Sequence, residues 1–134
     1  MISILTKIKT LAVTAPEFSA ENLIFAQRAL NRLFIAPIPQ EYITFINLQN
    51  SFECSGCRLY GILPGNGNPL DIVNANLCAG LPDSNKKIVL GENEFDYLVF
   101  NYDCDAYQIV DKEDFEVLEE YTDLETALNH ILKF

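Results

Sequence analysis

Tryptophan is absent from this chain of 134 residues, and histidine occurs only once, as His130. Among the neighbouring acids of the chain are Asp103 with Asp105 and Glu119 with Glu120. Glycoside hydrolysis needs two carboxyl groups at a fixed separation in a pocket with aromatic platforms for the sugar, so these pairs give it little support. A cysteine–histidine enzyme needs its histidine beside a thiol and an orienting acid, and no spacing brings these together. We therefore expect a protein that is not an enzyme.

Basic side chains are also scarce, with 9 against 19 acidic ones and a net charge of −10. The imbalance begins after position 50: residues 1–50 carry 4 basic and 3 acidic side chains, whereas residues 51–134 carry 5 and 16. Without a basic stripe to neutralise phosphates, we expect no nucleic-acid binding. An acidic surface also repels anionic membranes and attracts a basic partner. The alternative interpretation is a solvated surface that only maintains solubility.

No apolar run is long enough to span a bilayer, and Lys7 and Lys9 interrupt the apolar N-terminal segment where a signal peptide needs an unbroken one. We therefore expect a cytoplasmic protein. The length fits one domain, residues 1–134, with a single core.

The four cysteines are not numerous enough to require a disulfide framework in a chain with an adequate core, so we expect reduced thiols. Cys54 and Cys57 form a CxxC pair. A redox pair of the thioredoxin type lies at a helix N-terminus, whereas a strand is predicted after Cys57. Zinc needs two further ligands, which Cys78, Cys104 or His130 would have to supply singly. We expect no metal and no cofactor.

Three short strands are predicted between positions 87 and 111: Ile88 to Leu90, Asp96 to Tyr102 and Ala106 to Val110. β-Branched and aromatic residues fill the strand positions, while Gly, Asn and Asp fill the turns at 91–94 and 103–105. This pattern indicates an antiparallel meander. One apolar face of such a sheet has to be covered by helices, because isolated strands are marginally stable in water.

Apolar side chains at helical spacing predict five helices around this meander. Four expected ranges are 2–13, 39–50, 70–79 and 122–132, and one more helix is expected between the N-cap Ser19 and the Pro37-Ile38-Pro39 segment. The apolar stripe of that helix is expected to end at Leu33 or Phe34. Ile46 and Leu77 are expected on the buried faces of the helices at 39–50 and 70–79, and Gly80 is expected to end the latter. Ser19 is the expected N-cap of the second helix, and Thr122 with Glu125 forms an expected capping box for the last one. A strand from Arg58 to Leu63 and another from Phe115 to Tyr121 complete the order. It predicts an α+β single domain, in which a largely antiparallel sheet packs against N-terminal helices and a C-terminal helix.

Several segments of the predicted elements resemble the SUKH superfamily. In chain order they are Ile38 to Ile46, Leu59 to Ile62, Asp71 to Asn76, Ile88 to Glu92 and Asp96 to Leu98, followed by a strand pair and a helix near Tyr121 to Leu132. The superfamily includes the fungal Smi/Knr cell-wall-assembly regulators, the bacterial YrhA-like proteins and many immunity proteins of polymorphic toxin systems. The resemblance covers residues 20 to 133 in short pieces. It implies a binding domain and not an active site.

Within these segments the expected roles are structural. Tyr42 and Phe45 face the core, and Gly61 permits the close approach of another element. Asp96 is expected to satisfy backbone donors in the preceding turn.

Together, the resemblance and the acidic surplus lead to the hypothesis of an immunity protein that neutralises a cognate toxin, with a nuclease as the implied class of toxin. An acidic face would match a basic nuclease cleft, speed association and exclude substrate. The expected contact residues are acids at the meander turns with two tyrosines as anchors: Glu92, Glu94, Asp96, Asp103, Asp105, Tyr97 and Tyr107. The alternative is a regulatory scaffold that binds cellular proteins, as the fungal relatives imply.

Overall fold

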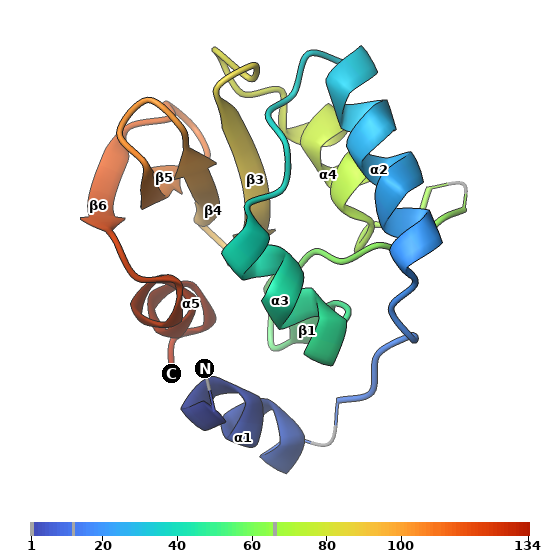
Figure 1. Cartoon of the computed structure of the whole chain (residues 1–134). Helices are drawn as coiled ribbons and strands as arrows, with labels where there is room; N and C mark the ends of the chain where they lie inside the picture. Colours follow the sequence, from blue (N-terminus) through green and yellow to red (C-terminus); the bar gives the residue numbers. More distant parts are fainter. Residues whose placement is uncertain (1, 12, 66) are drawn as a thin grey trace.

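The computed structural model describes residues 2–11, 13–65 and 67–134, and their order of elements confirms the predicted α+β class (Figure 1). The helices are α1 (Ile2–Thr10), α2 (Ala20–Arg32), α3 (Gln40–Leu48), α4 (Ile72–Ala79) and α5 (Leu124–Leu132). The strands are β1 (Phe52–Cys54), β2 (Cys57–Leu59), β3 (Lys87–Glu92), β4 (Asp96–Asn101), β5 (Ala106–Asp111) and β6 (Val117–Tyr121). They form one antiparallel sheet in the order β1-β2-β3-β4-β5-β6. The predicted meander is therefore confirmed and is extended by a hairpin at its N-terminal side.

Helices cover this sheet from more than one side. Helix α5 packs across β2 to β6, and α1 lies against α5, so the two chain ends are neighbours (Figure 1). Helix α4 packs against β3, and α2 packs against α4. Leu98 and Val99, consecutive residues of β4 that point to opposite faces, are both 0% exposed. The centre of the sheet is thus buried on both faces, where the sequence predicted cover on one.

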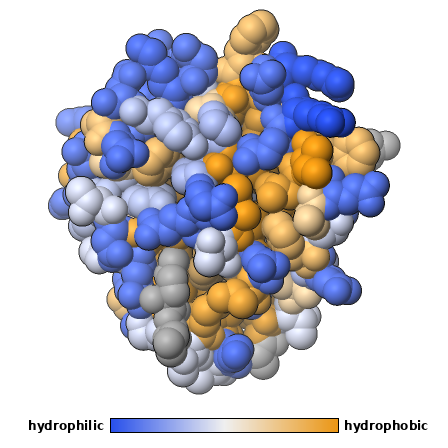
Figure 2. Space-filling model, in the orientation of Figure 1, coloured by the Kyte–Doolittle hydropathy of each residue, from blue (hydrophilic) through white to orange (hydrophobic). Residues whose placement is uncertain are grey.

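On the surface, apolar and polar side chains are unevenly distributed. Figure 2 shows apolar surface gathered over the half of this face that contains α2 and α3, while the half over β4 to β6 is mainly hydrophilic. No helix among the described residues is long and apolar enough to cross a membrane.

The predicted strand from Arg58 to Leu63 is wrong beyond Leu59, because the backbone there turns towards the start of α4. Gly61 donates its N–H to the carbonyl of Leu70 and forms a single parallel bridge with Asp71. A Cβ atom at Gly61 would lie 2.3 Å from Oδ1 of Asn50, which confirms the expected close approach of another element.

The predicted turn at 91–94 begins later than expected, because β3 continues through Gly91 and Glu92. A Cβ atom at Gly91 would lie 2.6 Å from the carbonyl oxygen of Arg58 in β2. The glycine is therefore required by the close approach of two strands and not by a turn. The register of the β3–β4 pair also shifts between Val89 and Gly91.

Buried asparagines complete the hydrogen bonding of segments that lack a neighbouring strand. Strand β2 pairs with β3 only at Gly91 and Glu92, so the outer edge of β3 has no strand beside Val89. Asn76 of α4 fills this place: its Oδ1 accepts from the Val89 N–H at 2.8 Å, and its Nδ2 donates to the Val89 carbonyl at 2.9 Å. Asn50 does the same for Ile62, at 2.7 Å and 3.0 Å. Each amide thus imitates one residue of a strand.

The buried face of α3 and the N-cap of α2 agree with the predictions, whereas the end of α2 does not. Tyr42, Phe45 and Ile46 of α3 are buried as expected, and Ser19 caps α2 by accepting from the N–H of Asn22 at 3.2 Å. The predicted end of the α2 stripe is wrong, since the helix stops at Arg32 and Phe34, with φ of 57°, is 78% exposed.

Two further helix predictions are wrong. Leu77 was expected on the buried face of α4 but is 54% exposed, because the face that meets β3 carries Ile72 and Asn76. Helix α1 ends at Thr10 and not at Val13; Ala12, which the prediction included, lies outside the described residues.

The capping box predicted for the last helix is also wrong, because the N-cap of α5 is Asp123 and not Thr122. Asp123 Oδ2 accepts from the Thr126 N–H at 2.9 Å and from the Thr126 hydroxyl at 2.6 Å. These bonds lower the pKa of the Asp123 carboxyl. Glu125 instead accepts a hydrogen bond from Ser3 of α1.

We predict that Asp123→Ala lowers the free energy of unfolding by about 1 kcal/mol and that Thr122→Ala changes it by less than about 0.5 kcal/mol. Because the pKa of Asp123 is lower in the folded state, its contribution is complete above the unfolded-state pKa and is lost as the pH falls through the folded-state value. Urea unfolding near neutral pH and again in acid should therefore show that the difference in unfolding free energy between the wild type and Asp123→Ala is smaller in acid. Equal losses in the two variants would contradict the cap.

We also predict that Asn76→Ala lowers the free energy of unfolding by about 2–4 kcal/mol, because buried backbone groups of Val89 lose their partners. Asn74→Ala is the matched control on the same helix. Its amide makes a surface bond to the carbonyl of Asn68, so its loss costs less than about 1 kcal/mol. Urea denaturation measures both, and similar values would show that the Asn76 amide is not needed at the sheet edge.

Candidate functional site

Three hairpin turns of the sheet lie at one end of the molecule. In a meander, alternate turns fall at the same end, and the register places Arg58 of β2 opposite Glu92 at the end of β3. The β3–β4 turn is joined to the β5–β6 turn by a hydrogen bond from the Lys112 N–H to the Phe95 carbonyl at 3.1 Å. The β1–β2, β3–β4 and β5–β6 turns therefore form one continuous surface.

This surface, which we name the acidic end, gathers eight carboxylates and two cations. The acids are Glu53, Glu92, Glu94, Asp96, Asp111, Glu113, Asp114 and Glu116, and the cations are Arg58 and Lys112. Most of the acids lie on the hairpin turns or in strand residues next to them. The charge excess predicted from the sequence is therefore concentrated here in space.

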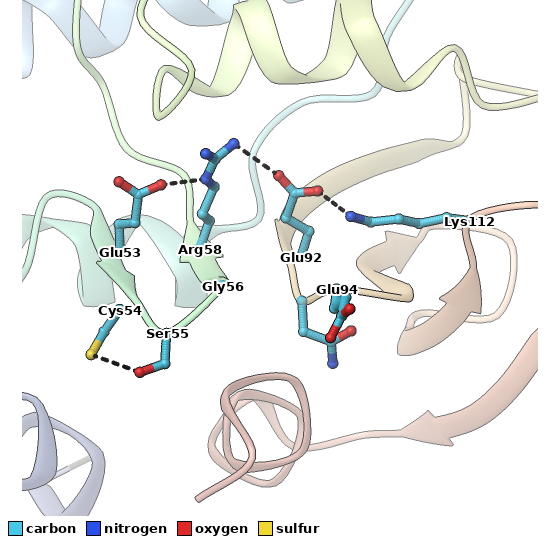
Figure 3. A pocket seen from close by; sticks show the side chains of 9 residues that line it. Glu53, Cys54, Ser55, Gly56, Arg58, Glu92, Glu94 and Lys112 are labelled. Carbon is cyan, nitrogen blue, oxygen red and sulfur yellow. Dashed lines mark hydrogen bonds and ion pairs between the residues drawn. The ribbon is translucent and has the colours of Figure 1, made fainter.

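Four of these charges form a row across an open cleft of about 550 Å³ (Figure 3). Glu53 accepts from Arg58, whose guanidinium also lies 3.5 Å from Oε1 of Glu92. The other oxygen of Glu92 is 2.5 Å from Nζ of Lys112. Acids and cations alternate, so each cation lies next to a carboxylate and Glu92 is held between two cations.

Lys112 also contacts an aromatic side chain outside the cleft, in the neighbouring pocket that Tyr60 and Tyr97 line. Its Nζ lies 5.3 Å from the ring centre of Tyr97. Burial and the neighbouring Glu92 raise the pKa values of Tyr97 and of the buried Tyr60, so both phenols are neutral near pH 7. Ser55, which also lines the cleft, has its hydroxyl 3.7 Å from the Cys54 sulfur. The charged side chains of the cleft can hold a partner by charge and hydrogen bonds.

Asn93 holds the β3–β4 turn in place. Its Oδ1 accepts from the N–H groups of Phe95 at 3.0 Å and Asp96 at 2.9 Å, and its Nδ2 donates to the Ile131 carbonyl of α5 at 3.2 Å. The role predicted for the Asp96 side chain thus belongs to Asn93, because only a residue at the start of the turn can accept from the donors that follow it.

Phe95 at the tip of this turn is 65% exposed. It lies among the carboxylates of the acidic end, with its backbone bonded on both sides, to Asn93 and to Lys112. A large exposed aromatic ring on a fixed turn is a typical interface anchor. Phe95 was not among the predicted contact residues, although an apolar residue inside a turn segment was the available signal.

The seven predicted contact residues are divided between the two ends of the sheet. Glu92, Glu94, Asp96 and Tyr97 belong to the acidic end. The other three lie in or next to the β4–β5 turn, separated from it by the length of β4, roughly 17 Å for six residues. The predicted set therefore does not form one face.

At the far end, Asp103 is 3.4 Å from Lys86, and Asp105 has φ of 52°, which confirms the turn role expected of this segment. Tyr107 is 2% exposed, donates to Glu41 of α3 at 2.7 Å and packs on Phe100. Its ring belongs to the core.

The remaining candidates are the single histidine and the four cysteines. His130 is 2.7 Å from the Tyr121 hydroxyl. Cys54 and Cys57 face each other across the β1–β2 hairpin, and Cys78 and Cys104 are exposed. Within residues 2–11, 13–65 and 67–134, no three His, Cys, Asp or Glu side chains are grouped to hold a metal ion.

Comparisons with protein-family models, curated proteins and solved structures find no match for this chain. The SUKH resemblance stays a prediction. The fold and the site define an α+β protein whose six-stranded sheet presents an acidic end with an exposed aromatic tip.

We predict that Glu92 and Lys112 are coupled by about 1 kcal/mol in a double-mutant cycle of Glu92→Gln and Lys112→Met, because both side chains are partly buried. The exposed pair Asp103 and Lys86 supplies the control, with Asp103→Asn and Lys86→Met coupled by less than about 0.5 kcal/mol. Urea unfolding of the four variants in each cycle gives these energies. Coupling no larger in the cleft than in the control would show that the row adds no stability.

Proposed function

We propose that this protein is a binding protein that neutralises a basic toxin through its acidic end. The observation that carries the proposal is the convergence of three acidic hairpin turns around the exposed ring of Phe95. Carboxylates attract and orient a basic partner, and an aromatic side chain supplies the apolar contact that holds it.

The carboxylates of this surface are not equivalent. Glu53 and Glu92 are already paired with Arg58 and Lys112, so their charge is largely compensated within the protein. Asp111 and Asp114 accept from backbone N–H groups of the β5–β6 turn and hold its shape. Glu94, Glu113 and Glu116 are exposed and have neither role. These three are the expected contacts for basic side chains of the partner.

Rigidity of the Phe95 turn favours binding as well. Asn93 bonds the turn to itself and to α5, and Lys112 bonds it to the neighbouring hairpin. A side chain presented by a fixed turn loses little conformational freedom when a partner covers it. The apolar anchor and the surrounding charges are therefore ready before the partner arrives.

A nuclease is the class of toxin that this surface fits best. An enzyme that cleaves nucleic acid presents basic side chains to the phosphates of its substrate. Carboxylates placed against those side chains compete with the phosphates and accelerate association. The SUKH resemblance supports the same assignment, since many members of that superfamily are immunity proteins.

The proposal is tested with the toxin domain encoded by the gene beside this one. Cells that express the toxin should survive only when this protein is co-expressed, and the purified protein should inhibit nuclease activity at a one-to-one ratio. A neighbouring toxin that is neither bound nor inhibited, or a gene without a toxin beside it, would overturn the immunity function in favour of a regulatory scaffold.

For the same complex we predict that Glu94→Gln, Glu113→Gln and Glu116→Gln together slow association about tenfold or more at low salt. Phe95→Ala should mainly speed dissociation, because the complex loses an aromatic side chain that the partner would bury. The control removes three charges at the other end of the sheet, with Asp83→Asn, Asp103→Asn and Asp105→Asn; asparagine tolerates the positive φ of Asp83 and Asp105. Surface plasmon resonance at two salt concentrations measures both rates. Equal slowing by the two triple variants would show that net charge acts and not the acidic end.

A further inference from the structure

Cys54 and Cys57 occupy directly opposite positions of the β1–β2 hairpin. The two residues between them, Ser55 and Gly56, have φ values of 52° and 81°, as in the two-residue turns that fix the register of a hairpin. Opposite residues of an antiparallel pair have Cα atoms about 4.5–5.5 Å apart, and their side chains share one face. A disulfide bridges Cα atoms about 4.4–6.8 Å apart. The hairpin therefore holds the two thiols within bonding reach.

Both thiols line one pocket of about 260 Å³, whose other walls include Phe52, Leu132 and Phe134. Cys57 is buried, with its sulfur 3.8 Å from the Leu132 carbonyl, whereas Cys54 is only half-buried. Burial raises the pKa of the Cys57 thiol. One cysteine is thus accessible to a reagent and the other is protected beside it, which is the arrangement of an attacking and a resolving thiol.

We propose that Cys54 and Cys57 form a reversible dithiol–disulfide site that reacts with low-molecular-weight disulfides of the glutathione type. The Cys54 thiolate attacks one sulfur of oxidised glutathione, forms a mixed disulfide and displaces the first glutathione thiolate, which takes up a proton. Cys57 then loses its proton and attacks the Cys54 sulfur, which displaces the second glutathione. Two electrons and two protons pass from the protein to the oxidant, and two reduced glutathione molecules leave.

A disulfide between Cys54 and Cys57 would be reversible, because the loop that it closes is short. A disulfide that closes a loop of four residues removes little entropy from the unfolded chain, so it adds little stability. Bonds of this kind are reduced more easily than structural disulfides. Their neighbours Glu53 and Arg58 belong to the row of charges in the cleft, so oxidation ties together the two strands that carry them (Figure 3). The site itself does not depend on the identity of the partner.

The test equilibrates the whole protein with mixtures of reduced and oxidised glutathione, quenches with acid and alkylates the remaining thiols. Mass spectrometry of the intact protein should show two of the four thiols protected without a glutathione adduct, and peptide mapping should link Cys54 to Cys57. Reduced glutathione should reverse the link. Cys57→Ala should accumulate glutathione on Cys54, since the resolving thiol is missing and alanine leaves a small apolar side chain in the pocket.

Cys78→Ser and Cys104→Ser are the matched controls, because both cysteines are exposed and neither lies across a hairpin from another. Each control should retain the link. Four alkylated thiols in oxidised glutathione alone would overturn the proposal, as would a lasting glutathione adduct on wild-type Cys54. A link that uses Cys78 or Cys104 would overturn it too.

Discussion

The fold depends on how the outer edge of β3 is satisfied. Strand β2 pairs with β3 only at Gly91 and Glu92, so the backbone groups of Val89 would otherwise be buried without partners. The Asn76 amide of α4 hydrogen-bonds to both the N–H and the carbonyl of Val89. The Tyr42 hydroxyl of α3 lies 2.9 Å from the Leu90 carbonyl and 2.5 Å from that of Tyr60. Because buried polar groups are costly when unpaired, α3 and α4 are fixed on the sheet by hydrogen bonds as well as by apolar packing.

That edge also determines where the site lies. The short β2 strand meets only the end of β3, and Gly91 allows the two backbones to approach closely beside Arg58. The β1–β2 turn is thereby brought to the end of the sheet that already holds the β3–β4 and β5–β6 turns. Arg58 then reaches Glu92, and Lys112 reaches it from the opposite side. The charged row is a consequence of sheet topology, since its four residues come from three separate hairpins.

The sequence predicted those parts of the fold that local patterns determine. Alternating apolar residues and turn residues identified β4 and β5, and Ser19 and Gly80 marked the ends of helices correctly. It failed where a residue serves a distant element. Gly91 resembles a turn glycine in the sequence, but its role is set by Arg58, which lies 33 positions earlier. Asn76 resembles an ordinary polar helix residue, and only the folded chain places it at the edge of β3.

The same limit applies to the candidate site. The acidic surplus was visible in the sequence, and so was its concentration after position 50. The grouping was not, because hairpin turns alternate between the ends of a sheet: Asp103 and Asp105 belong to one end, and Glu94 and Glu113 to the other. For the aromatic residues the prediction failed in two ways: Tyr107 was predicted as a contact residue, and Phe95 was not. The sequence alone does not show which aromatic side chain is buried and which is exposed. Tyr107 lies in the core and Phe95 is exposed.

The distribution of charge at the acidic end reconciles stability with binding. Eight carboxylates in one region repel one another, and such repulsion opposes the compact state. The partly buried Glu92 is held between Arg58 and Lys112, and Asp111 and Asp114 are engaged by backbone N–H groups. Of the exposed acids without such partners, Glu94 lies on one turn and Glu113 and Glu116 lie on another, where water and salt screen them. A basic partner would relieve the repulsion that remains, so the charges that cost the free protein some stability are those that favour its complex.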